Sequence, residues 1–224
     1  MDDLAGRTVW SVSAVPGGWA AAEKLERHLE WAREGGVAAG QTRLPVNEPL
    51  ARLASRLESM LRGSRSPLAP SEQTDSELYA CGAASGETLV GQDVSAEDVV
   101  VFQDALGPAM ARAVRERGAY AVWHVRLGRT PAGVAATEAW GLLSLYASAL
   151  DAYLMTWSRR SRPGATMRGV AALMPAPDLV AAKEMRPEQR QGIGWGSALA
   201  DVVEVARGER VGGTLRPRPA VSRR

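Results

Sequence analysis

The sequence predicts a three-layer α/β domain with a Rossmann-like, mainly parallel sheet. Segments of strand length alternate with segments of helical periodicity along the first 185 residues. Most strand segments are continuously apolar rather than alternating, and "DVVVF" (98–102) is the clearest example. Continuously apolar strands are typical of parallel sheets that helices cover on both faces. A chain of 224 residues is long enough to give such a domain a substantial core.

The predicted strands are short apolar segments, several rich in β-branched residues, that glycine, proline or polar residues interrupt. In chain order they cover residues 7–15, 37–44, 98–102, 119–127, 152–158 and 169–175.

The predicted helices carry apolar residues at helical spacing, and most of them end at glycine. In chain order they cover residues 19–36, 47–63, 108–117, 137–149 and 196–208. The second is the clearest, because Leu50, Leu53, Leu57 and Leu61 fall on one face and Asn47 is a candidate N-cap.

These elements predict one Rossmann-like domain over residues 1–185. Within it, "SRSPLAPSEQTDS" (64–76) is rich in proline, serine and charge and is predicted to be a mobile loop. Residues 186–208 are predicted to form a C-terminal helical extension. Residues 209–224 carry several arginines and are predicted to be a basic, flexible tail.

Composition indicates a cytoplasmic globular protein. No run of about 18 apolar residues occurs, and the opening "MDDLAGRTVW" has no apolar signal region. Cys81 is the only cysteine, which excludes an internal disulfide and a four-cysteine zinc site. The net charge is only +2, with arginines scattered among acidic residues. We therefore expect neither a nucleic-acid nor a membrane partner.

Ligands of parallel α/β sheets bind beyond the carboxyl ends of the strands. The sequence places glycine, polar or aromatic residues at that edge after four predicted strands. The candidate substrate-binding residues are Gly17, Gly18, Gln103, Asp104, Trp123, Arg126, Ser158 and Arg159.

Several of these candidates also have a structural interpretation. The glycines of "VPGGWA" (15–20) resemble a phosphate-cradling turn, but any strand-to-helix turn favours glycine. The polar pair Gln103 and Asp104 separates an apolar strand from a helix, so it is either ligand chemistry or a turn. Trp123, like most tryptophans of the chain, has a packing interpretation as well.

No metal site and no catalytic residue are assigned from the sequence. His28 and His124 are the only histidines, and neither has a second ligand at metal-site spacing. His28 is interpreted as a surface residue and His124 as a core histidine. No nucleophile motif occurs.

In order and spacing, the segments resemble the N-terminal domain of a retaining glycosyltransferase of family four, in its trehalose synthase (trehalose phosphorylase-like) branch. "LAGRTVWSVSAVPGGWAAAEKLERHLEWAREGGV" is similar to the family's opening strand, Gly-rich acceptor loop and first helix. "EDVVVFQDALGPAMARAVRERGAYAVWHVRLG" resembles its strand with a His-Asp-Pro turn, the following helix and the next strand. Gln103 and Ala105 replace the His and Pro of that turn, Asp104 is kept, and Arg126 stands where the family has a later His.

The resemblance implies one half of a GT-B glycosyltransferase, the acceptor-binding half, without the donor domain that binds the nucleotide sugar. It predicts an acceptor-side half or pseudo-glycosyltransferase that acts with a partner chain, either a glycosyltransferase or a separate donor-domain protein, or as a homodimer. A nucleotide sugar would then be a co-substrate through the partner, and the chain would need no cofactor of its own. Two alternatives stay open: a stand-alone sugar-transferring or phosphorolytic enzyme, and a non-catalytic sugar- or nucleotide-binding module.

Overall fold

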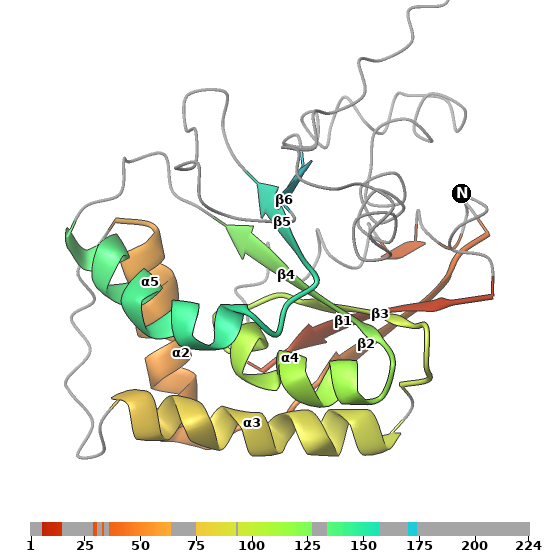
Figure 1. The fold of residues 1–224 in the computed structure, drawn as a ribbon, viewed down its shortest axis with the longest axis horizontal. Helices are drawn as coiled ribbons and strands as arrows, with labels where there is room; N and C mark the ends of the chain where they lie inside the picture. Colours follow the sequence, from red (N-terminus) through yellow and green to blue (C-terminus); the bar gives the residue numbers. More distant parts are fainter. Residues whose placement is uncertain are drawn as a thin grey trace, which may run out of the picture.

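The computed structural model confirms the α/β class and the parallel sheet (Figure 1). It describes residues 6–14, 29–30, 33, 36–63, 75–92, 94–126, 134–156 and 170–173. Six parallel strands form one sheet in the order β2-β1-β3-β4-β5-β6. They are β1 (Thr8–Ser13), β2 (Ala38–Arg43), β3 (Val99–Phe102), β4 (Tyr120–Arg126), β5 (Ala152–Thr156) and β6 (Val170–Leu173). Each lies within or very near a predicted strand.

The strand order reverses between β1 and β3. From β1 the chain moves outward to β2, and from β3 it moves the other way to β4, β5 and β6. The crevice beyond the carboxyl ends of β1 and β3 is therefore the topological switch point, where open α/β sheets bind their ligands. The register aligns Phe102 of β3 with Val12 of β1 and with Trp123 of β4.

Four helices lie together on one side of the sheet (Figure 1). They are α2 (Glu48–Leu61), α3 (Asp75–Gln92), α4 (Gly107–Glu116) and α5 (Val134–Ala147). In α2 the predicted cap is confirmed, because the Asn47 side chain accepts a hydrogen bond from the Leu50 amide at 3.0 Å. The four leucines of its predicted apolar face are buried. None of the helices that the structure describes is both long and apolar enough to cross a membrane.

Helix α3 was not predicted, and the expected loop over 64–76 is wrong at its end because α3 begins at Asp75. Its start is fixed by an ion pair between Asp75 and Arg56 of α2. Its glycines, which weaken any prediction of a helix, allow α4 to approach closely. A Cβ added at Gly86 would lie 3.2 Å from the backbone of Met110. Residues 64–74 lie outside the described part of the chain.

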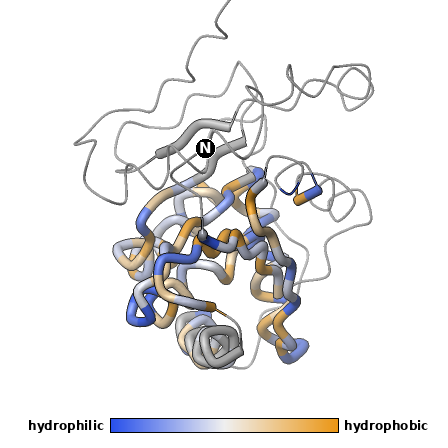
Figure 2. Tube along the Cα trace, turned by 90° about the vertical axis from the view of Figure 1, so that its right-hand side faces the viewer, coloured by the Kyte–Doolittle hydropathy of each residue, from blue (hydrophilic) through white to orange (hydrophobic). Residues whose placement is uncertain are grey.

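Both faces of the sheet are buried. The face that packs on the helices carries Val12, Val100, Phe102, Ala121, Trp123 and Val125. The opposite face carries Val9, Val99, Val101 and Val122, all with 0% exposure. In the hydropathy view, hydrophobic segments run through the middle of the domain (Figure 2).

The predicted third layer is not tested, because most of the residues that would form it lie outside the described part of the chain. Of the helix predicted at 19–36, residues 29–30 and 33 are described and helical, and Leu29 is buried. The predicted extension at 186–208 and the tail at 209–224 lie outside the described residues.

Candidate functional site

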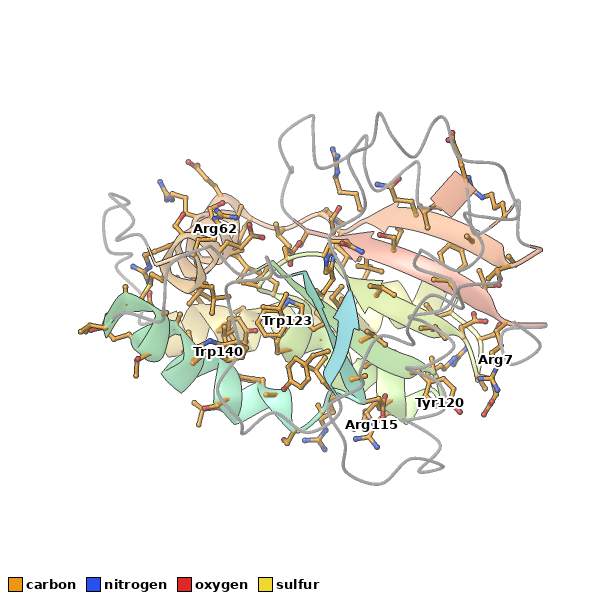
Figure 3. The ribbon with its side chains drawn as sticks, turned by 90° about the horizontal axis from the view of Figure 1, so that it is seen from above. Arg7, Arg62, Arg115, Tyr120, Trp123 and Trp140 are labelled. Atoms are coloured by element: carbon orange, nitrogen blue, oxygen red, sulfur yellow. The ribbon has the colours of Figure 1, made fainter. Side chains whose placement is uncertain are left out.

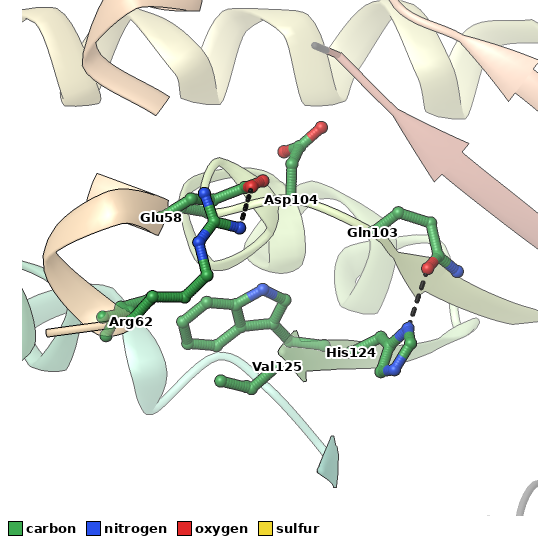
Figure 4. A pocket seen from close by; sticks show the side chains of 9 residues that line it. Glu58, Arg62, Gln103, Asp104, His124 and Val125 are labelled. Carbon is green, nitrogen blue, oxygen red and sulfur yellow. Dashed lines mark hydrogen bonds and ion pairs between the residues drawn. The ribbon is translucent and has the colours of Figure 1, made fainter. Parts of the chain in front are cut away.

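An open pocket lies at the carboxyl ends of β3 and β4, beside the switch point (Figure 4). It is a shallow pocket that is partly open to solvent. Helix α2, the β3–α4 turn and β4 supply its lining: Glu58, Leu61, Arg62, Gln103, Asp104, Ala105, Trp123, His124 and Val125.

Three of the eight predicted site residues come together at this pocket: Gln103, Asp104 and Trp123. Arg126 ends β4 at the same edge of the sheet, although only its backbone is described. The remaining four, which are Gly17, Gly18, Ser158 and Arg159, lie outside the residues that the structure describes.

Asp104 holds the switch point together through its carboxylate. One oxygen accepts a hydrogen bond from the Ala14 amide at the end of β1, at 2.6 Å. The other accepts from the Leu106 amide two residues along the chain, at 3.0 Å, which closes an Asx-turn. Only 4% of Asp104 is exposed. The carboxylate therefore ties β1 to the β3–α4 turn.

Asp98 makes the corresponding connection at the opposite, amino end of the same two strands. Its Oδ1 accepts from the Thr8 amide at 2.9 Å, where β1 begins. Its Oδ2 accepts from the Ser95 amide at 2.9 Å and from the Trp10 indole N–H at 3.2 Å. Because no ligand edge lies at that end of a parallel sheet, Asp98 shows what a purely structural aspartate does here. Asp104 has the same bonding pattern.

Asp151 makes the same kind of side-chain-to-backbone connection between β4 and β5. Its Oδ2 accepts from the Ala121 amide at 2.8 Å, and its Oδ1 lies 3.3 Å from the Arg115 guanidinium. Burial raises the pKa of the Asp151 carboxyl, although the Ala121 hydrogen bond and the charge of Arg115 act in the opposite direction. Aspartates that follow or precede a strand and accept from a backbone amide of the neighbouring strand are thus a recurring structural element of this sheet.

Gln103 and His124 form a cross-strand polar pair with a different geometry. The register that aligns Phe102 with Trp123 brings the next residues of the two strands side by side. The Oε1 atom of Gln103 lies 2.9 Å from Nδ1 of His124 (Figure 4). With the amide oriented in this way its oxygen accepts, so Nδ1 of His124 carries the proton. His124 is partly exposed at the pocket rather than a core histidine.

Strand alternation places this pair on the sheet face away from the four helices. That face changes character along the strands: it is apolar at the amino end and polar toward the carboxyl end. The polar positions are Ser11, Ser13, Gln103 and His124. Ser11 is 0% exposed, and its hydroxyl has no hydrogen-bond partner in the described part of the chain. Interior faces of parallel sheets are normally apolar, so this polar patch needs a functional or structural reason.

On the helix side, the last turn of α2 adds an ion pair to the pocket. Arg62 Nη1 lies 3.3 Å from Glu58 Oε2 (Figure 4). Both side chains are partly exposed, so the pair contributes little to stability. Its charges nevertheless face the pocket.

Trp123 forms the pocket's inner wall rather than an open stacking surface. Only 1% of it is exposed, and its ring centroid lies 5.6 Å from that of Trp140 in an edge-on arrangement (Figure 3). The packing interpretation of Trp123 is therefore confirmed.

Contacts with α3 and with Phe102 also hold the β3–α4 turn in place. The Tyr79 hydroxyl of α3 donates to the Ala105 carbonyl at 2.7 Å, and burial raises the pKa of Tyr79 well above its ordinary value. A Cβ at Gly107 would lie 2.4 Å from Cβ of Phe102, so only glycine fits where α4 begins. The turn is thus held by a hydrogen bond and by close packing.

The sequence did not assign Glu58, Arg62 or His124 to the site. His124 had a usable signal, because parallel pairing of the two apolar strands places it beside Gln103. Glu58 and Arg62 had none, because a helix that follows a strand usually places its amino end, not its last turn, at this edge.

No group of three or more His, Cys, Asp or Glu side chains within the described ranges is arranged to hold a metal ion. No protein-family model matches the chain, and no curated protein matches it.

Proposed function

We propose that this chain is an acceptor-side, carbohydrate-binding domain that acts with a partner glycosyltransferase chain. The observation that carries the proposal is the Gln103–His124 pair at the carboxyl edge of a parallel sheet, beside the switch point.

Sugar hydroxyls both donate and accept hydrogen bonds. Beyond the hydrogen bond between them, the Gln103 amide contributes N–H donors and the neutral His124 imidazole contributes an Nε2 acceptor, so the pair suits such a ligand. Ser13, which is partly exposed on the neighbouring strand, adds a further polar position to the same face. Polar groups that orient a ligand at this edge are typical of α/β binding sites.

A partner is proposed because glycosyl transfer needs more than an acceptor site. The leaving diphosphate must be held and neutralised, and the acceptor hydroxyl must be placed against the anomeric carbon. Both oxygens of Asp104 accept backbone hydrogen bonds, which favours a positioning role over that of a general base. The collinear resemblance to a family-four N-terminal domain also supports acceptor binding by this chain and donor binding by a partner chain.

Binding can be tested by following backbone amide NMR shifts during titration with glucose, trehalose and a nucleotide sugar. We expect saturable shifts at Gln103 and His124, and roughly tenfold weaker binding in Gln103→Ala and His124→Ala, since each loses about one hydrogen bond. Arg112→Ala is the control, because Arg112 lies on α4 with its side chain 85% exposed and outside the pocket. If none of the sugars shifts these amides at tens of millimolar, the proposal fails.

The partner is tested by co-expression with a glycosyltransferase chain followed by affinity purification. We expect co-purification and no sugar transfer by the isolated chain. Turnover of a nucleotide sugar by the isolated chain, abolished in Arg126→Ala, would instead establish the stand-alone enzyme.

A further inference from the structure

The amino end of α4 lies at the switch point, beyond the carboxyl ends of β1 and β3. Helix α4 begins at Gly107, five residues after the end of β3. Free N–H groups and the helix dipole make such an end a common site for phosphate in α/β folds. Here the residue before the helix, Leu106, provides no side-chain cap.

The protein's own carboxylate already occupies this position. Asp104 accepts from the Leu106 amide at 3.0 Å, and its other oxygen takes the Ala14 amide across the crevice. The Gly107 amide donates to the Asp104 carbonyl at 3.2 Å, and the Ala109 amide to the Leu106 carbonyl at 3.0 Å. The donors that would meet an incoming anion are therefore engaged, and a buried negative charge stands among them.

We infer that Asp104 is a specificity-determining residue that makes this edge select uncharged ligands over phosphate-bearing ones. An anion approaching α4 meets the carboxylate where related folds offer free N–H groups, and like charges brought together at a binding site oppose association. Glu58 adds a second carboxylate to the pocket, balanced by Arg62. The inference relies on the proposed function only for the identity of the neutral ligand, a sugar.

The test is an NMR titration of the backbone amides of Ala14, Leu106 and Gly107 with inorganic phosphate, and separately with glucose and glucose 6-phosphate. In the wild type we expect no saturable response to phosphate, and glucose 6-phosphate at least about tenfold weaker than glucose. Asp104→Asn removes the charge and releases one N–H, so its Leu106 or Gly107 amide should respond to phosphate. Asp98→Asn removes the matching charge at the far end of β1 and β3 and should behave like the wild type.

Saturable phosphate shifts at Leu106 and Gly107 in the wild type would overturn the inference, whether or not glucose binds. A folded Asp104→Asn that stays unresponsive would also overturn it, because the charge would not be what excludes phosphate. If Asp104→Asn does not fold, the wild-type phosphate titration alone decides. If phosphate behaves as expected but glucose gives no response, the proposed function fails while the charge selection stands.

Discussion

The two aspartates that flank β3 give the sharpest test of how this sheet is held together. Asp104→Asn keeps one acceptor oxygen and turns the other into a donor that faces a backbone N–H. One buried, charge-assisted hydrogen bond of 2.6 or 3.0 Å is lost. Such bonds contribute about 1.5–3 kcal/mol each, so we expect the free energy of unfolding to fall by about that amount. Against a typical total of roughly 5–15 kcal/mol, the variant should stay folded.

Equilibrium unfolding in urea measures this loss as a lower midpoint with an unchanged slope. Asp98→Asn should lose a comparable amount, because Asp98 accepts three hydrogen bonds at the other end of the strands. Hydrogen exchange then separates the two positions. Exchange of the Ala14 amide should accelerate only in Asp104→Asn, and that of the Thr8 amide only in Asp98→Asn. A free energy of unfolding within about 0.5 kcal/mol of the wild type, with Ala14 exchange unchanged, would refute the reasoning.

Three further outcomes follow from the packing and the charges. Gly107→Ala should destabilise the protein by about 1–3 kcal/mol, because its Cβ would lie 2.4 Å from Phe102. The control Gly141→Ala, whose Cβ would have nothing within 4 Å, should be neutral or stabilise α5. Equal unfolding midpoints for the two variants would contradict this. Tyr79→Phe should lower the free energy of unfolding by about 1–3 kcal/mol, because the buried Ala105 carbonyl loses its hydrogen-bond donor. An unchanged thermal midpoint would argue against a stabilising Tyr79–Ala105 hydrogen bond. Carboxyl-carbon NMR should place the pKa of Asp151 above its ordinary value. The stability of the wild type relative to Asp151→Asn should then be greatest below the ordinary pKa and fall as the pH rises through the raised pKa. An ordinary or lowered pKa would show that burial does not dominate.

How far the sequence predicted the fold depends on whether an element's pattern is local. Helix α2 was predicted because its leucines repeat at helical spacing and Asn47 caps it, and both features belong to the segment itself. Helix α3 was missed because Gly82 and Gly86 lower its intrinsic helix propensity, and their purpose appears only when α4 packs against them. Tertiary contacts therefore decide α3, and a single sequence does not display them.

The site divides in the same way. The rule that ligands bind beyond the carboxyl ends of parallel strands led to Gln103, Asp104 and Trp123, which line the pocket. It did not distinguish their roles, because these depend on which way each side chain points. Glu58 and Arg62 reach the pocket only because of how α2 lies across the sheet edge, which local sequence does not determine.

Gln103 and Asp104 are neighbours in the chain but act in different directions. Gln103 continues the alternation of β3, so its amide lies on the face away from the helices and pairs with His124. Asp104 follows where the strand has ended, and its carboxylate points away from His124 into the backbone of the turn (Figure 4). Both of its oxygens accept from backbone N–H groups, so the geometry favours holding the turn over acting as a base. Under the proposed function, this edge would hydrogen-bond the sugar in a fixed place, and the charge neutralisation of a glycosyl transfer would come from groups beyond this pair.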